Sequence, residues 1–562
     1  MEKNWLQSYP PGIPAEIGPL EDNSLAELIE KACRRHADRT AFLSMGRAMG
    51  YGELDRLAAG FAGWLQSVGL GKGSRVALMM PNLLQYPVCL FGALRAGCVV
   101  VNCNPLYTPR ELEYQLKDSG AEALVVVENF AHTVEQVLPQ TAVQHVVVTP
   151  MGEMLGAFRG ALVNLMVRRV RKLVPAWRIP HAINLSAALA VGRRRGFQPP
   201  ELGLDDLAFL QYTGGTTGVA KGAMLSHRNI VGNVTQACAW IHSHIREGEE
   251  LIVTALPLYH IFALTANCLT FLRFGARNLL IANPRDIPGF IRELKRHPFT
   301  AITGVNTLFN ALLNHPDFDT VDFSKLNITL GGGMAVQQAV AERWQRVTGC
   351  PLIQAYGLTE TSPAITINPL DLPAFNGSAG LPIPSTELSI RDDDGQEVGI
   401  GQVGEICVRG PQVTTGYWRR PDETANVFMP DGFLRTGDMG YVDEKGFVFL
   451  VDRKKDIILV SGFNVYPNEV EDVVAAHPGV RDVAAVGVPS EHSGETVKIF
   501  VVRKDPTLTA ESLIAHCRTQ LTSYKVPRQV EFRDDLPRTN VGKVLRRALK
   551  EPAGSANESA RP

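Results

Sequence analysis

The stretch QYTGGTTGVAKGAMLSHRN, residues 211–229, decides the fold prediction. Four glycines let its backbone approach a ligand closely, while three threonine hydroxyls and Lys221 can bind phosphate oxygens. It continues the strand-like run LAFLQY and leads into the amphipathic run HRNIVGNVTQA, as a loop between two buried elements would. Ala220 and Gly222 flank Lys221 where a Walker A loop has Gly and then Ser or Thr. The stretch therefore predicts a phosphate-binding loop and excludes a P-loop ATPase.

The alternation of strand-like and helical runs extends over residues 40–380. PRELEYQLKDSG and VQQAVAERWQRVTG have helical periodicity, and short β-branched runs lie between such segments. These runs are SRVALMMP, ALVVVE, HVVVT, LIVTALP, AITGV and ITLGGG. Strands buried on both faces and separated by helices indicate an α/β fold with parallel sheets. After Pro384, turn signals such as DDDG predict antiparallel hairpins, and a compact α+β pattern follows from about residue 467.

Length and composition are those of a soluble chain with several folding units. It has 562 residues, 45% apolar and 20% charged, with a net charge of −1. The balanced charge argues against a nucleic-acid partner. The N-terminus lacks the apolar run of a signal peptide, and PVCLFGALRAGCVVV (87–101) is too short for a membrane span and contains Arg95. We expect a cytoplasmic protein in which that run is a buried helix leading into a strand.

The nine cysteines show no metal-binding or disulfide spacing. None forms a Cys-x-x-Cys motif, and no pair of histidines has zinc spacing. We therefore expect buried free thiols, with neither a structural metal nor a disulfide framework.

Residues 151–195 differ from the rest because they carry nine basic residues and one acid, Glu153. The same segment is apolar and contains Phe158 and Trp177. A basic amphipathic stretch with aromatic residues can lie on an anionic membrane surface, on the cytoplasmic face of the inner membrane. A helical insertion packed on the main domain, or a solvated helix face, also explains the pattern. Both interpretations stay open.

Six motifs in order resemble those of the adenylate-forming superfamily, which includes acyl-CoA synthetases, firefly-type luciferases and the adenylation domains of peptide synthetases. The motifs are YTGGTTGVAKG (212–222), PLYHIFA (257–263), GGG (331–333) with YGLTE (356–360), TGD (436–438), DRKKD (452–456) and PRTNVGK (537–543). Residues 431–455 are also similar to the signature block of fatty acyl-CoA synthetases. The runs NPLYTPRELEYQLKDSGA (104–121) and YTGGTTGVAKGAMLSHRN (212–229) resemble bacterial long-chain-fatty-acid–CoA ligases. The resemblance covers nearly the whole chain.

The resemblance implies both a fold and a reaction. The fold is a large N-terminal domain of two αβ subdomains and a small β-barrel, followed by a mobile α+β C-terminal lid. We place the N-terminal domain at residues 1–454, the lid at 455–549 and a disordered tail at 550–562. The reaction joins a fatty acid to the α-phosphate of ATP, which gives acyl-AMP and pyrophosphate, and CoA then displaces AMP. Catalysis would rest mostly on positioning and electrostatic stabilisation.

The resemblance also implies a role for each motif residue. The nucleotide would be bound by Thr213, Gly214, Gly215, Thr216, Thr217, Gly218, Lys221, Gly331, Gly332, Gly333, Tyr356, Asp438 and Arg453. The catalytic residues would be Lys543, Glu360, Thr359 and His260, with Glu360 and Thr213 holding Mg²⁺. Lys455 would be the hinge of the lid, and Ser461 and Gly462 would face CoA after the lid rotates.

Several alternatives remain at this stage. A medium-chain acyl-CoA synthetase, or an acyl-AMP ligase that delivers to a carrier protein, would share these motifs. A carrier-directed ligase typically has an insertion that limits lid rotation, and none precedes the hinge. A luciferase-like oxidation is disfavoured by the acyl-CoA synthetase block, and a non-catalytic sensor by the presence of Glu360, Asp438 and Lys543. Acyl chain length and oligomeric state, a homodimer included, are not determined by the sequence.

Overall fold

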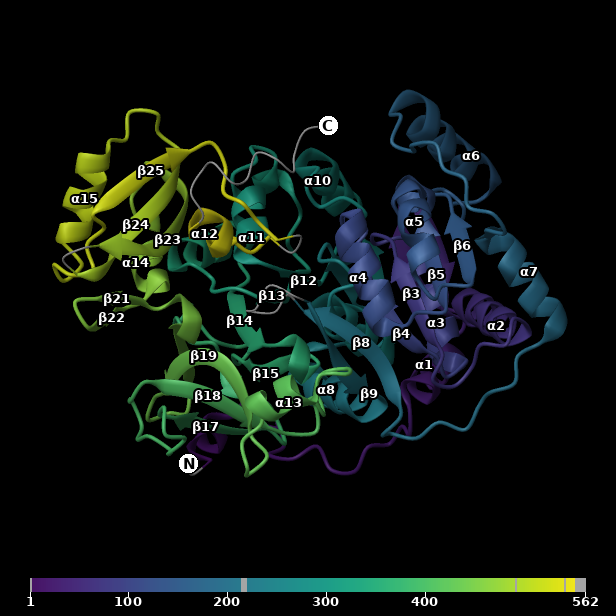
Figure 1. Cartoon of the computed structure of the whole chain (residues 1–562), viewed down its shortest axis with the longest axis horizontal. Helices are drawn as coiled ribbons and strands as arrows, with labels where there is room; N and C mark the ends of the chain where they lie inside the picture. Colours follow the sequence, from purple (N-terminus) through teal and green to yellow (C-terminus); the bar gives the residue numbers. More distant parts are fainter. Residues whose placement is uncertain (1–2, 214–219, 491–492, 540–541, 551–562) are drawn as a thin grey trace.

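Four β-sheets organise the chain, and the computed structural model describes residues 3–213, 220–490, 493–539 and 542–550 (Figure 1). The first sheet has seven strands in the order β7-β6-β5-β3-β4-β8-β9. Its strands are β3 (Arg75–Met79), β4 (Val99–Asn102), β5 (Ala123–Val127), β6 (His145–Thr149), β7 (Ile183–Asn184), β8 (Leu207–Thr213) and β9 (Lys221–Ser226). All neighbours are parallel except β8 and β9, which form an antiparallel hairpin.

The second sheet has nine strands in the order β16-β15-β14-β13-β12-β10-β11-β1-β2. Its strands are β1 (Thr40–Ser44), β2 (Arg47–Gly50), β10 (Leu251–Thr254), β11 (Arg277–Leu280), β12 (Ala301–Gly304), β13 (Ile328–Gly331), β14 (Leu352–Gly357), β15 (Ala364–Ile367) and β16 (Leu381–Pro382). The strands from β14 to β1 are parallel, and antiparallel pairs close both edges. The predicted α/β fold with parallel sheets is confirmed.

Helices cover both faces of these sheets. Those of the larger part are α1 (Leu25–Arg35), α2 (Tyr51–Ser67), α3 (Gln85–Arg95), α4 (Pro109–Ser119), α5 (Ala131–Val137), α8 (His227–Ile241), α9 (Thr270–Arg273), α10 (Ile287–Arg296), α11 (Asn306–Leu313) and α12 (Gln338–Thr348). Alternate residues of β3 enter two different cores: Val76 and Leu78 join that of α2 and α3, while Ala77 and Met79 join that of α4 and α5. This period of two explains why the strand reads as continuously apolar.

The run at 87–101 is a buried helix followed by a strand, as predicted. Residues of α3 are buried throughout, and β4 follows at Val99. Arg95 is 8% exposed and reaches Glu30 at 3.0 Å and Asp55 at 2.8 Å, so its charge is paired. Among the described residues, every helix is too short or too polar to cross a membrane. All nine cysteines are buried, and their thiols are free.

The third sheet is antiparallel and contains β17 (Glu387–Arg391), β18 (Gly404–Arg409), β19 (Leu434–Val442) and β20 (Val448–Arg453) in that order. It occupies the place expected for the small β-barrel, and helix α13 (Pro421–Val427) lies in the connection between β18 and β19. Figure 1 shows it in green, below the C-terminal part of the chain. The predicted change from parallel to antiparallel pairing after Pro384 is confirmed.

The C-terminal part forms a separate α+β unit with its own five-stranded sheet (Figure 1, yellow). Its strands are β21 (Ile458–Val460), β22 (Phe463–Val465), β23 (Val480–Ser490), β24 (Gly494–Arg503) and β25 (Gln529–Arg533). Its helices are α14 (Pro467–Ala475), α15 (Ala510–Arg518) and α16 (Arg546–Lys550). Lys550 closes α16 rather than opening the tail predicted at residues 550–562, and residues 551–562 lie outside the described part.

The basic segment 151–195 divides into two structurally different parts. Helix α7 (Leu185–Arg195) packs closely on α2: a Cβ placed on Gly192 would lie 1.7 Å from the Gly60 carbonyl oxygen. Helix α6 (Ala157–Leu165) and the π-helical turn Met166–Val170 instead project at one corner of the molecule (Figure 1). Of the two interpretations of this segment, the packed helical insertion therefore describes α7. Helix α6 instead exposes several apolar side chains to solvent.

Candidate functional site

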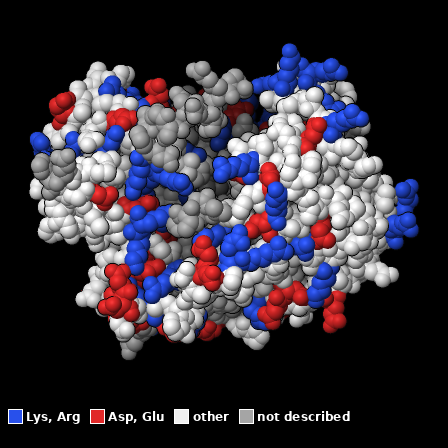
Figure 2. Space-filling view, viewed as in Figure 1, with Lys and Arg blue, Asp and Glu red and all other residues white. Residues whose placement is uncertain are grey.

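The predicted site residues gather at the carboxyl ends of strands from both parallel sheets. Thr213 ends β8, Gly331 ends β13, and Tyr356 lies near the end of β14. In open α/β sheets, ligands bind at this edge of the strands. Figure 2 shows lysine and arginine side chains along the hollow at the centre of the molecule, between the C-terminal unit and the rest. This distribution suits an anionic ligand.

The phosphate loop (residues 212–222) is the connection of the β8–β9 hairpin. Thr213 pairs with Lys221 across the hairpin, so both ends of the loop are fixed by the sheet. Gly214, Gly215, Thr216, Thr217 and Gly218 lie outside the described residues. The Lys221 side chain is buried, forms an ion pair with Glu423 of α13, and lies 5.4 Å from the ring centre of Tyr417. The sequence prediction missed Glu423 and Tyr417, because neither stands in a motif that was singled out.

Glu360 lies in the short 3₁₀ turn Thr359–Thr361, directly after β14. Tyr417 Oη donates a 2.7 Å hydrogen bond to Glu360 Oε1, and the Thr414 amide donates to the Glu360 carbonyl at 2.7 Å. Within the described part of the chain, Oε2 of Glu360 receives no hydrogen bond and remains available to a ligand. Thr359 precedes it and is half-buried.

Asp438 joins the second sheet to the third. Tyr356 Oη donates to its Oδ2 at 2.8 Å, and Arg453 Nε lies 2.7 Å from its Oδ1. Asp438 is 6% exposed, and burial raises the pKa of its carboxyl group, an effect that Arg453 and Tyr356 oppose. The antiparallel pairing of β19 and β20 sets this arrangement, since Asp438 and Arg453 are direct partners in the ladder.

Lys543 reaches this cluster from the C-terminal unit. A Cβ placed on Gly333 would lie 3.8 Å from Lys543 Cε, so the lysine passes directly over the glycine loop after β13. Gly333 also has a φ of +77°, which favours glycine. Burial and the charge of Arg453 together lower the pKa of Lys543 to about 8, against the opposing effect of Asp438 and Glu360. The structure thus brings a residue of the C-terminal unit together with residues of the second and third sheets.

His260 lies within the electrostatic influence of the same lysine. It follows β10, and its Nδ1 accepts a 3.3 Å hydrogen bond from the Phe262 amide. Burial lowers the pKa of His260 to about 3, and Lys543 contributes to the shift. The imidazole is therefore neutral at pH 7, as a group bordering an apolar ligand would be. Phe262 also limits the space at Gly332, where an added Cβ would lie 3.1 Å from its ring.

Comparisons with known proteins agree with this geometry. Residues 29–418 match the family model "AMP-binding enzyme", and residues 469–543 match "AMP-binding enzyme C-terminal domain". The chain belongs to the AMP-binding enzyme family.

Three individual matches illustrate the relationship. A long-chain-fatty-acid–CoA ligase of Escherichia coli O157:H7 is 60% identical over 554 residues, which cover 98% of this chain and 99% of the relative. An anthranilate CoA ligase solved with anthranoyl-AMP has a TM-score of 0.82 at 25% identity, with 94% of this chain and 97% of that one covered. ATP-bound MatB from Rhodopseudomonas palustris has a TM-score of 0.78 at 29% identity, with 94% and 98% covered.

The predicted hinge residue of this AMP-binding enzyme lies beside the cluster, two positions after Arg453, whereas the predicted CoA-facing residues lie away from it. Lys455 is exposed in the 3₁₀ turn Lys454–Asp456. Ser461 and Gly462 form the two-residue turn of the β21–β22 hairpin, with φ angles of 52° and 84°. Both are exposed, and Figure 1 places the hairpin at the outer edge of the C-terminal unit. The structure brings Lys543 into the site and leaves Ser461 and Gly462 outside it.

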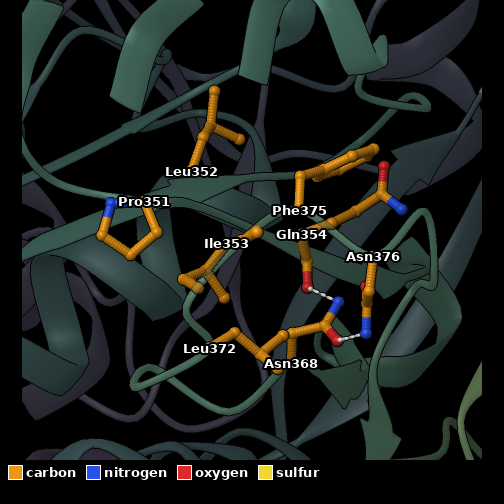
Figure 3. A pocket seen from close by; sticks show the side chains of 9 residues that line it. Pro351, Leu352, Ile353, Gln354, Asn368, Leu372, Phe375 and Asn376 are labelled. Carbon is orange, nitrogen blue, oxygen red and sulfur yellow. Dashed lines mark hydrogen bonds between the residues drawn. The ribbon is translucent and has the colours of Figure 1, made fainter. Parts of the chain in front are cut away.

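The AMP-binding enzyme also has a small pocket beside β14, lined by Pro351, Ile353, Leu372 and Phe375 (Figure 3). Asn368 Nδ2 donates to the Gln354 carbonyl at 3.1 Å, and Asn376 Nδ2 donates to Asn368 Oδ1 at 3.3 Å. These polar groups satisfy one another, and none of the predicted site residues lines the pocket. It is a feature of the packing around β14 rather than part of the cluster.

Proposed function

We propose that this protein is a long-chain-fatty-acid–CoA ligase. It uses ATP to convert a fatty acid into acyl-AMP and pyrophosphate, and then transfers the acyl group to CoA with release of AMP. The observation that carries the proposal is the position of Lys543, which reaches from the C-terminal unit into a cluster with Glu360, Asp438 and Arg453. Near-full-length similarity to a long-chain-fatty-acid–CoA ligase supports the choice of substrates.

In the first half-reaction, the site acts mainly through the charges of its side chains. The fatty acid carboxylate and the α-phosphate repel each other, and the protonated Lys543 attracts both. Asp438 binds the ribose hydroxyls, Tyr356 stacks on adenine, and Arg453 and the glycines Gly331 to Gly333 complete the nucleotide site. Thr359 contacts the α-phosphate. Lys221 and the threonines of the phosphate loop hold the departing pyrophosphate, once ATP has displaced Glu423 from Lys221.

Mg²⁺ fits the residues present. A single carboxylate oxygen, Glu360 Oε2, is available next to the phosphate loop, and Thr213 offers a hydroxyl at the loop's start. Mg²⁺ commonly binds through one or two protein oxygens together with substrate phosphates and water. No group of three or more His, Cys, Asp or Glu residues within the described ranges would compete for it. When bound, the ion would neutralise phosphate charge.

The second half-reaction requires a different arrangement of the two units. We place the N-terminal domain at residues 1–454 and the lid at 455–549, with rotation at Lys455. Rotation withdraws Lys543 and brings Ser461 and Gly462 to the acyl-AMP, where the open space around Gly462 admits the pantetheine arm of CoA. The neutral His260 borders the acyl group. The conformation described here therefore corresponds to the first half-reaction.

The test is an assay of pyrophosphate and AMP release with fatty acids of graded chain length, with and without CoA. Wild-type protein should form acyl-AMP without CoA, turn over only with CoA, and prefer long chains. Lys543→Ala should lose acyl-AMP formation by a factor of about 100 or more and retain transfer from supplied acyl-AMP to CoA. A preference for medium chains, or for a carrier protein over CoA, would replace the proposed substrates. Activity indifferent to Lys543 would contradict the mechanism.

We further propose that the protein is cytoplasmic and associates peripherally with an anionic membrane through α6 and the turn that follows. Phe158, Leu162 and Val170 are 83%, 51% and 72% exposed, and Leu165 and Met166 add to this apolar surface. Figure 2 shows basic side chains over the same corner of the molecule. Apolar side chains beside cationic ones match the two layers of an anionic bilayer surface.

One basic residue of this segment has a structural role instead. Arg168 pairs with Glu128, whose side chain is 3% exposed, so replacing Arg168 would disturb the core. A vesicle test should therefore use Phe158→Ser with Val170→Ser, and separately Arg169→Gln with Arg171→Gln. Both variants should bind anionic vesicles about tenfold more weakly while keeping activity on soluble short-chain acids. Unchanged vesicle binding would show that α6 is a solvated helix face and not a membrane contact.

A further inference from the structure

A buried polar network connects the two sides of the predicted hinge. Asp452 lies on the N-terminal side of the predicted hinge, near the end of β20, and its side chain is fully buried. The amide of Asn468, at the start of α14, donates to Asp452 Oδ2 at 2.8 Å, and Arg546 Nη1 lies 3.7 Å from Asp452 Oδ1. The Asn468 side chain donates to the Val451 carbonyl at 3.3 Å. Three contacts thus join β20 to the C-terminal unit.

Arg546 is the centre of this network. Its Nη2 donates to Asn468 Oδ1 at 2.9 Å and to Glu471 Oε2 at 2.8 Å, and its Nη1 lies 3.6 Å from Asp456 Oδ2. Glu471 in turn accepts a 2.8 Å hydrogen bond from the Ala485 amide of β23. Arg546 is therefore fixed within the C-terminal unit by Glu471, and it reaches Asp452 from there.

Arg546 stands only three residues after Lys543, and the segment between them is held by the backbone. The Thr539 amide donates to the Lys543 carbonyl at 2.6 Å, and the Leu545 amide donates to the Pro537 carbonyl at 2.8 Å. Leu549 of α16 packs against residues of β23 and β24, which holds this helix on the C-terminal sheet. The position of Arg546 is consequently coupled to that of Lys543.

We propose that Asp452, Asn468 and Arg546 form a latch across the hinge that holds Lys543 in the site for the first half-reaction. They are positioning residues, and the inference rests on the adenylation and hinge roles proposed above. Asp452 is a buried carboxylate that accepts hydrogen bonds from the Arg453 and Asn468 amides and forms an ion pair with Arg546. Asn468 and Arg546 belong to the C-terminal unit, so rotation at Lys455 separates Asp452 from both, and an unpaired buried charge is costly. The Arg546–Glu471 pair moves with the lid and is unaffected.

Asp452→Asn in the full-length protein tests the latch, because it removes the charge and leaves Arg546 paired with Glu471. Single-turnover formation of acyl-AMP should fall about fivefold, as the competent conformation becomes less populated. Transfer from supplied acyl-AMP to CoA should be unchanged or faster. Trypsin cleavage after Lys454 and Lys455, measured without ligands, should accelerate by a similar factor. The control is Asp534→Asn, since Asp534 is an exposed carboxylate of the C-terminal unit.

Asn468→Ala serves as the second variant, since it keeps the backbone donor and removes only the side-chain contacts. It should also slow acyl-AMP formation without slowing transfer to CoA, but by a smaller factor than Asp452→Asn. An equal loss in both half-reactions, with unchanged cleavage, would overturn the latch and leave Asp452 a structural residue. If wild-type protein forms no acyl-AMP at all, the proposed function fails, and the cleavage assay still decides whether Asp452 restrains the hinge.

Discussion

Tyr417 Oη lies 2.7 Å from Glu360 Oε1, and the ring of the same tyrosine lies beneath Lys221 Nζ at 5.4 Å. One side chain therefore contacts both the residue proposed to hold Mg²⁺ and the lysine proposed to hold phosphate. Burial, with Glu360 nearby, raises the pKa of Tyr417, so its hydroxyl stays a donor. It fixes one carboxylate oxygen of Glu360, and among the described residues no donor binds the other. We therefore expect Tyr417 to set the spacing between the proposed metal and phosphate subsites.

Tyr417→Phe should raise the Mg²⁺ concentration required for half-maximal acyl-AMP formation about fivefold. A hydrogen bond to a charged group contributes about 1.5–3 kcal/mol, and the half-buried carboxylate recovers part of this from water. Mn²⁺ binding in the presence of ATP, followed by electron paramagnetic resonance, should weaken in parallel. Tyr441→Phe is the control, because Tyr441 stacks on Phe449 away from the cluster. Equal metal affinity in both variants would contradict the role of the hydroxyl.

Acyl-AMP formation should decline as pH rises through about 8. Burial lowers the pKa of Lys543 to about 8, so the side chain is charged below that pH and loses its proton above it. The kcat/KM for ATP reports the free enzyme and should fall about tenfold per pH unit on the alkaline side. In Lys543→Arg, which remains charged, the profile should be lower but flat over the same range. An identical alkaline limb in that variant would assign the titration to another group.

Arg95→Met should lower the free energy of unfolding by about 2 kcal/mol, since it leaves Asp55 without its cation and Glu30 with only Arg34, at 3.9 Å. Both carboxylates retain some solvent access, which keeps the loss below that of a fully buried pair. Urea denaturation followed by circular dichroism measures it. Arg110→Met on the exposed face of α4 is the matched control and should be near neutral. Equal stability of the two variants would show that the pairing contributes little.

Gly192→Ala should destabilise the packing of α7 on α2 by about 3 kcal/mol, because the added Cβ would lie 1.7 Å from the Gly60 carbonyl oxygen. Thermal unfolding should begin at lower temperature, and hydrogen exchange in α7 should accelerate. Gly203→Ala, where the added Cβ would lie 3.9 Å from Asp206 Oδ2, should have little effect. If both variants were equally stable, α7 would not be part of the packed core.

Local sequence patterns predicted most of the elements. The buried strands β3, β5, β6, β10, β12 and β13 each stand where a short β-branched run occurs, because a strand covered on both faces needs apolar residues throughout. The pattern did not predict that β1 and β2 join the second sheet. β1 pairs with β11, which follows more than 200 residues later, and pairing at that distance leaves no local signal. β2 joins the sheet through β1.

The sequence by itself determined the α/β character, the order of the motifs and the residue types that could bind a nucleotide. Tertiary structure alone decided which side chains meet. Lys221 and Glu423 are 202 positions apart, and Glu360 and Tyr417 are 57 apart. The division of segment 151–195 into a packed α7 and an exposed α6 likewise depends on the glycine contacts with α2. Motifs are local, whereas ion pairs and close packing depend on surfaces that only folding brings together.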